Sequence, residues 1–108
     1  MTSLPGAVTI HKFTAGRFDK ERLADEIAAV AGDVASTLPG LRRAIVLREY
    51  GGSHIAIVAE WEDHEALAAG TGALYADPRL HELAAETGES TNEAYTPVSS
   101  VEGQPAGD

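Results

Sequence analysis

The sequence of 108 residues contains no cysteine, a single tryptophan and few basic residues. The absence of cysteine excludes a disulfide framework, a thiolate nucleophile and a cysteine-ligated metal. With 17 acidic residues against 8 basic ones, the net charge is −9. Such a balance argues against a nucleic acid or an anionic membrane as partner, because phosphate groups are bound by clustered lysine and arginine.

Long apolar runs are also missing, and none approaches the length that crosses a bilayer. The first residues, MTSLPGAV, lack the basic start and apolar stretch of a signal peptide. These absences predict a cytoplasmic protein.

The residues that are present predict one domain over 1–108, with a core of about 8–101 and a polar tail at 102–108. Val8–Phe13 alternates and is rich in β-branched residues, which predicts a strand. Asp19 is placed to cap a helix. The apolar stripe of that helix recurs at spacings of three and four: Leu23, Ile27, Val30, Val34 and Leu38.

Two further strands, Leu41–Tyr50 and Ser53–Glu62, are joined by a Gly-Gly pair suited to a two-residue turn with positive φ. The register set by this turn brings opposite charges together in two pairs, Arg43 with Glu60 and Glu49 with His54. Both faces of this hairpin are apolar at the centre, yet the few helices can cover only one of them. The second face therefore predicts a partner sheet, and hence a homodimer.

A helix begins after Asp63, and the Gly-Thr-Gly segment at 70–72 is expected to interrupt it. Asp77 and Pro78 begin the next helical segment. A last strand is predicted over Ala94–Val101, at a sheet edge because it contains a proline. The order β-α-β-β-α-β, with a split second helix, predicts an α+β, ferredoxin-like fold with an antiparallel four-stranded sheet.

The segments VAEWEDHEAL, where an apolar strand ends in Trp61 before acidic residues, and ADPRLHEL are the most distinctive in the chain. They resemble the antibiotic biosynthesis monooxygenase family of dimeric α/β-barrel proteins. Small actinomycete enzymes that form quinones in aromatic polyketide pathways are the most similar in appearance. The resemblance covers Val8–Val101, and it implies two identical chains with a pocket between sheet and helices in each.

This resemblance implies a cofactor-independent monooxygenase that oxidises an aromatic polyketide-like phenol or anthrone with O₂ in natural-product biosynthesis. No metal or flavin is expected, because a deprotonated polyphenol supplies the electrons itself. The alternatives are a non-oxidative polyketide cyclase or isomerase of the same fold, or a module that only binds.

Several positions depart from the quinone-forming enzymes. An asparagine four residues before the tryptophan is replaced by Ile57, a tyrosine six residues after it by Leu67, and a later arginine by Ala84. Heme cleavage is disfavoured because the first strand contains no asparagine. The only asparagine, Asn92, is expected to precede the last strand.

The candidate catalytic residues are His11, His81 and Trp61. His11 is either a buried neutral histidine or a base facing a pocket, and His81 borders the predicted stripe of its helix. Trp61 is either a packing aromatic or a pocket wall. The histidines show no metal-binding spacing, so no metal site is expected. The candidate substrate contacts are Tyr75, as a lid, with Arg48, Ile57 and Leu67.

Overall fold

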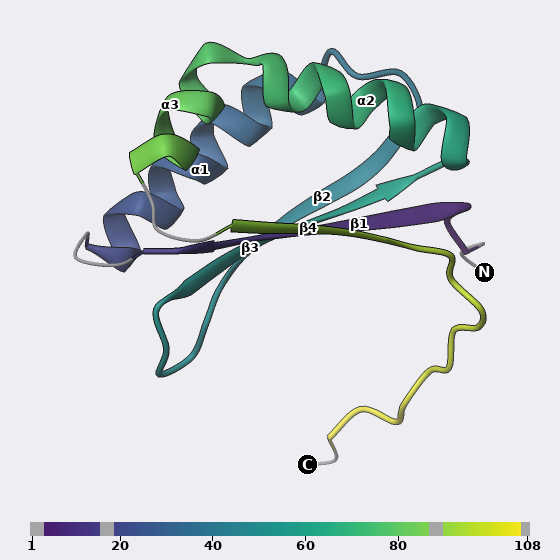
Figure 1. Ribbon diagram of the computed structural model, residues 1–108. Coiled ribbons are helices and arrows are strands. Elements are labelled where there is room, and N and C mark those ends of the chain that lie inside the picture. The colour runs from purple at the N-terminus through teal and green to yellow at the C-terminus, as the bar shows by residue number, and fades with distance from the viewer. Residues whose placement is uncertain (1–3, 16–18, 87–89, 107–108) are drawn as a thin grey trace.

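The computed structural model describes residues 4–15, 19–86 and 90–106, with the backbone alone at Tyr75 and 84–86. The elements in chain order are β1 (Ala7–Thr14), α1 (Lys20–Ala35), β2 (Leu41–Arg48), β3 (His54–Trp61), α2 (His64–Ala76), α3 (Pro78–Glu86) and β4 (Ser90–Tyr95). The strands form one antiparallel sheet in the order β2-β3-β1-β4. The helices lie over one face of this sheet (Figure 1), which confirms the ferredoxin-like α+β fold.

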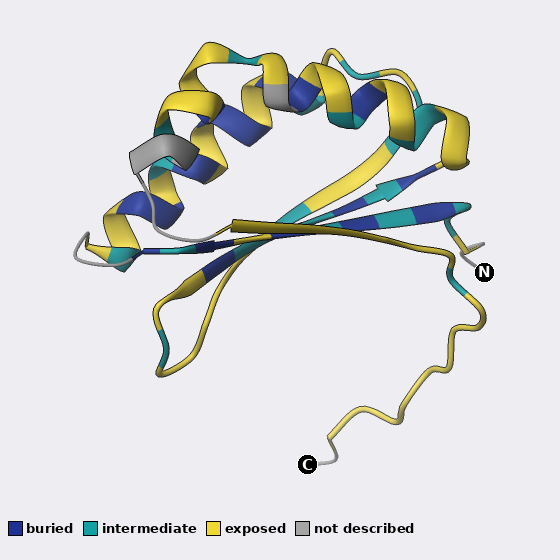
Figure 2. Ribbon diagram, in the orientation of Figure 1, coloured by how far each residue is buried: buried dark blue, intermediate teal, exposed yellow. Residues whose placement is uncertain are grey.

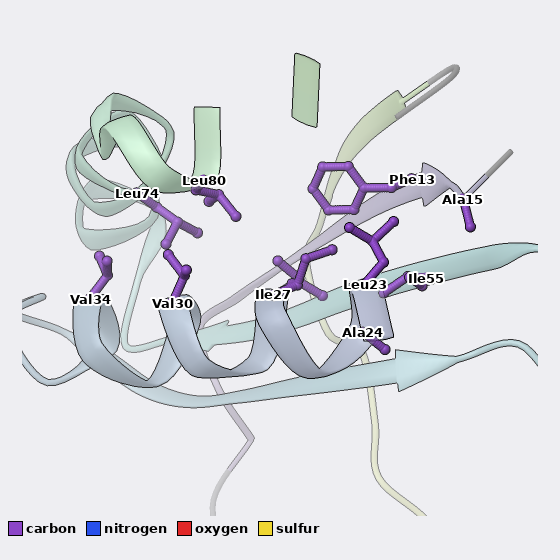
Figure 3. Packing of buried hydrophobic residues seen from close by; sticks show 11 residues of the cluster. Phe13, Ala15, Leu23, Ala24, Ile27, Val30, Val34, Ile55, Leu74 and Leu80 are labelled. Atoms are coloured by element: carbon purple, nitrogen blue, oxygen red, sulfur yellow. The ribbon is translucent and has the colours of Figure 1, made fainter. Parts of the chain in front are cut away.

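Helix α1 begins after the predicted cap, but it ends at Ala35, so Leu38 of the predicted stripe lies in the segment that follows the helix. The Asp19 side chain accepts hydrogen bonds from the backbone N–H groups of Glu21 and Arg22, at 3.0 and 3.3 Å. The buried side chains Leu23, Ile27, Val30 and Val34 of α1 point towards the side on which Phe13, Leu74 and Leu80 lie (Figure 3). The main apolar core joins this stripe to the strands and the other helices; its larger buried members are Phe13, Leu23, Ile27, Val30, Val34, Ile55, Ile57, Leu74 and Leu80.

Burial alternates along β1 and β3 (Figure 2). In β1 and β3 alternate side chains are buried under the helices, and the intervening ones face the uncovered side. Strand β4 is exposed along its whole length. Among the described residues, no helix is long and apolar enough to cross a membrane.

The hairpin register is confirmed from Arg43 to Arg48, but it shifts beyond Arg43, where Leu41 pairs with Trp61, and the predicted turn is wrong. Arg43 pairs with Glu60 and bonds to its carboxylate at 2.6 Å, and the Glu49 carboxylate lies 2.9 Å from the His54 ring. The paired strands end before the two glycines, however, and within the described residues Gly51 alone of that pair has positive φ, at 76°. The ladder thus opens into a longer connection, in which Glu49 N–H still donates to the His54 carbonyl.

Two other predicted boundaries are also corrected. Helix α2 continues through 70–72, and the split in the helical segment comes at Asp77 instead. The last strand begins at Ser90 and ends at Tyr95, so Pro97 lies outside it. The strand begins and ends where its pairing with β1 does, since Ser90 pairs with Phe13 and Tyr95 with Val8.

The presence of glycine at position 70 is explained by Trp61, which packs against that position. A Cβ atom at Gly70 would lie 2.1 Å from the Trp61 ring atom Cζ3, whereas at Gly72 it would meet nothing within 4 Å. The indole is fully buried and packs with Ala7 and Ala59. Glycine is therefore used here for close approach of α2 to the sheet, and it does not break the helix.

Gly70→Ala should lower the free energy of unfolding by about 1–3 kcal/mol, because the new methyl group overpacks a filled site. The matched change Gly72→Ala should raise it by roughly 0.5–1 kcal/mol through better helix propensity. Urea unfolding of both variants provides the measurement. Equal effects at the two positions would contradict the packing explanation.

Candidate functional site

A row of side chains crosses the helix-covered face of the sheet at its centre. Directly paired positions place Val46 of β2 beside Ile57 of β3, Ile57 beside His11 of β1, and His11 beside Asn92 of β4. Directly paired residues in an antiparallel sheet project to the same face. The row therefore runs from apolar to polar across the sheet.

The same division holds for the rest of this face. Strands β2 and β3 present mostly apolar side chains to the core, and α1 packs on them. The polar groups lie towards β1 and β4, where Thr9 and His11 are buried and the helix-facing residues of β4 are exposed. The β4 edge is thus the accessible side of the row, with His11 at the border between core and solvent.

His11 is held neutral by its surroundings. The residue is only 9% exposed, and its ring stacks on Phe13 with centroids 4.2 Å apart and planes 14° from parallel. Burial lowers the pKa of His11 to about 4, because the imidazolium loses its hydration there. At neutral pH the ring is therefore in the form that accepts a proton.

Trp61 is fully buried, and its polar group is used inside the protein. The indole Nε1–H donates to the hydroxyl oxygen of Thr9 at 3.1 Å. Thr9 lies on the same face of β1 as His11, two residues earlier. The tryptophan accordingly supports the strand that carries His11, and its N–H is already committed to Thr9.

Thr71 adds a polar group from the helix above. Leu67 of α2 packs on the cluster of Ala7 and Trp61 at one end of β1, and Leu74 belongs to the main core cluster, which also contains Phe13 from the other end of β1. Thr71 follows Leu67 by one turn on the same side of α2, so it lies over the middle of β1. Within the described part of the chain, its buried hydroxyl oxygen has no hydrogen-bond partner.

The other predicted site residues divide into two groups. Ile57 is next to His11, and Leu67 covers the Trp61 end of the site. Arg48 is exposed at the end of β2, and the full width of β3 separates that strand from β1, about 10 Å. His81 is exposed on α3, whose buried side is formed by Leu80. The backbone of Tyr75 lies in the last turn of α2, and its side chain is outside the described residues.

Two residues of this site were not predicted from the sequence. Asn92 was expected to precede the last strand, but it lies inside β4 opposite His11. Thr71 was assigned to a break in the helix. The spacing of Leu67, Thr71 and Leu74 along an unbroken α2 was the pattern that identifies it.

A separate hollow of about 500 Å³ lies between α2 and the segment that follows α1. Leu38 and Gly70 line it together with three acidic residues, Glu62, Asp63 and Glu65. None of the residues in the central row lines this hollow. Among the described residues, no three His, Cys, Asp or Glu side chains are grouped to hold a metal ion.

Comparisons with known proteins establish the fold. No protein-family model matches the sequence, and no functionally curated protein matches it. A mutant of SnoaB, a cofactor-independent oxygenase from Streptomyces nogalater, has a similar structure, with a TM-score of 0.71 and 22% identity over 88% of this chain and 95% of that one.

Two further structures resemble the chain to the same degree. The monooxygenase ActVA-Orf6 of Streptomyces coelicolor, in complex with nanaomycin D, gives a TM-score of 0.69 and 21% identity over 93% of this chain and 94% of that one. A dimeric ferredoxin-like protein from an uncultured marine organism gives a TM-score of 0.71 and 14% identity, also over 93% of this chain and 94% of that one. The structural neighbours are thus antibiotic biosynthesis monooxygenase-like proteins, as the two sequence segments predicted.

The lowered pKa of His11 predicts how stability depends on pH. Between pH 6.5 and about 4 the unfolded chain binds a proton that folded His11 does not. Stability is therefore lost as the pH falls through this range, by at most about 3 kcal/mol from this group. The variant His11→Gln should show a shallower loss between these pH values in urea unfolding. Identical pH profiles for the variant and the wild type would contradict a neutral buried His11.

The bond between Trp61 and Thr9 predicts a different pattern. Thr9→Val keeps the shape but leaves the indole N–H buried without an acceptor, which should cost about 1–3 kcal/mol. Thr9→Ser keeps the hydroxyl and should cost less. In a Trp61→Phe background the difference between valine and serine should vanish. A difference that persists there would show that the hydrogen bond is not its source.

Proposed function

We propose that this protein is a cofactor-independent monooxygenase that uses O₂ to oxidise a phenol or anthrone of the aromatic polyketide type. The observation that carries the proposal is the neutral, buried His11, which lies between the apolar half of the sheet and its accessible polar edge. An apolar surface suits a polycyclic ring, and a neutral imidazole suits removal of a ring proton.

In this reaction His11 accepts the proton of a ring hydroxyl, and the phenolate transfers one electron to O₂. Superoxide and the aryloxyl radical then combine at a ring carbon that carries hydrogen. The resulting peroxide takes the proton back from His11, and loss of the ring proton with cleavage of the O–O bond releases water. One atom of O₂ remains as the quinone oxygen and the other leaves as water, so no external reductant is needed.

Burial makes His11 available as a base but also makes it a weak one. Proton transfer is therefore favourable only where the phenolate and the imidazolium form side by side, since opposite charges attract strongly away from water. The buried position of His11 beside Ile57 meets this requirement. The exposed position of His81 does not, so His11 is the proposed base.

The remaining site residues have supporting roles in this proposal. Ile57 and Leu67 contact the ring system, and Tyr75, whose side chain is outside the described residues, remains the proposed lid. Trp61 positions β1 through Thr9 and makes no direct polar contact with the substrate. Arg48 would contact only a distant substituent of a larger substrate, because β3 lies between β2 and the strand that carries His11.

A homodimer is part of the same proposal. The uncovered face of the sheet carries apolar side chains such as Val8, Ile10 and Val58, which alternate with the buried ones. Leu47 and Tyr95 are 47% and 45% exposed. One of the structural neighbours is described as dimeric. A second copy packed on this face would bury these side chains.

The test is O₂ consumption by the metal-stripped protein with a panel of anthrones and hydroxynaphthalenes. We expect one O₂ consumed per quinone formed, with one ¹⁸O atom incorporated from ¹⁸O₂. His11→Gln should lower kcat about 10²–10⁴-fold, the usual contribution of a general base. His81→Gln should leave kcat within about twofold, because that side chain is exposed.

The control is His54→Gln, which removes an exposed histidine at the far end of the hairpin. Loss of activity in His81→Gln and retention in His11→Gln would reverse the assignment of the base. Product formed at the same rate without O₂ would replace the oxygenase with the cyclase or isomerase. Absence of turnover under both conditions would leave a binding module.

A further inference from the structure

We infer that Asn92 is a second catalytic residue, whose side-chain amide donates a hydrogen bond to the same substrate oxygen that gives its proton to His11. This inference rests on the proposed function and extends it to a residue on the opposite side of the base. It assigns the polar edge of the sheet a specific task, which is to stabilise the phenolate while O₂ takes an electron.

The position of Asn92 follows from strand pairing. His11 and Asn92 are direct partners in the antiparallel pair of β1 and β4. Side chains at directly paired positions leave the same face of the sheet, with Cβ atoms about 4.5–5.5 Å apart. An oxygen atom placed above this pair can be reached by both side chains at hydrogen-bonding distance, about 2.7–3.1 Å.

The fold itself does not require an asparagine at this position. Asparagine is depleted in strands, and Asn92 is the only one in the chain. Asn92 is exposed, and its side-chain amide makes no hydrogen bond within the residues that the structure describes. A residue that opposes the local strand preference beside a buried histidine is expected at a functional position.

An amide is chemically suited to assist a neutral histidine. It carries no charge at any pH near neutrality, so it neither competes for the proton nor alters the charge of His11. Its NH₂ group donates to a developing oxyanion, and such a bond is stronger to the phenolate than to the neutral phenol. Binding energy is therefore gained as the proton leaves, which lowers the pKa of the bound phenol.

The neighbouring polar groups are less suited to this task. The hydroxyl oxygen of Thr9 already accepts from Trp61. Thr71 approaches from α2, above the middle of β1, and so lies on the helix side of a ring placed in the site. Asn92 is the amide donor in the plane of the row, on the accessible side of His11.

The experiment titrates 1-naphthol bound to the protein without O₂, so that no oxidation occurs, and follows the absorbance of the naphtholate. The wild type should lower the pKa of the bound naphthol relative to free naphthol. Asn92→Leu should raise that pKa by about one to two units relative to the wild type, because one charge-assisted hydrogen bond is lost. Asn92→Gln, which keeps an amide, should restore part of the shift.

The control is Thr91→Val on the same strand, which projects to the opposite face and should leave the naphthol pKa unchanged. With O₂ present, Asn92→Leu should lower kcat about 10–100-fold with little change in KM, because the bond acts mainly on the phenolate. A merely structural role would instead alter folding or KM.

The outcomes separate this inference from the proposed function. If the wild type lowers the naphthol pKa and Asn92→Leu lowers it equally, the role of Asn92 is overturned and the oxygenase proposal remains. If the wild type turns over its substrate with no change in naphthol pKa, Asn92 is again excluded. If naphthol does not bind the wild type at all, the aromatic site at His11 is wrong, and both proposals fail together.

Discussion

The contact between Trp61 and Gly70 sets the distance between α2 and the sheet, and the rest of the site depends on that distance. The indole occupies the space that a side chain at residue 70 would need, and its N–H is bound to Thr9 in the strand that carries His11. One buried side chain thus determines both how close α2 lies and how β1 is held. Thr71, the next residue of the helix, is consequently brought over the middle of β1.

The site itself results from an unequal covering of the sheet. Helix α1 packs on β2 and β3, where the side chains are apolar, and leaves β4 exposed. His11 falls on the boundary between these two halves, where it is buried enough to stay neutral and near enough to the edge to be reached. A base of this kind would be of little use in a closed core, and in open solvent it would be protonated more readily and less able to assist an ion pair.

Much of the fold was predictable because its determinants are local. The cap and stripe of α1, the register of the hairpin and the cap at Asp77 each depend on residues a few positions apart in sequence. The continuity of α2 was not predictable, because glycine is needed at position 70 to make room for Trp61, which lies on another element. The start of β4 was missed because its first residues are polar, exposed and poor strand formers. They become part of a strand only through their pairing with β1. That same error kept Asn92 out of the predicted site.

The proposed function depends most on the binding of an aromatic ligand to the helix-covered face of the sheet around His11. This binding is tested most directly by mapping NMR chemical-shift changes on the protein as an unreactive hydroxynaphthoquinone is added under nitrogen. The largest changes are expected at the His11 ring, the Asn92 side-chain amide and the Thr71 methyl group. Changes confined to the acidic hollow between α2 and the segment that follows α1, at Leu38, Glu62 and Ala69, would contradict this location and would move the binding site to that hollow.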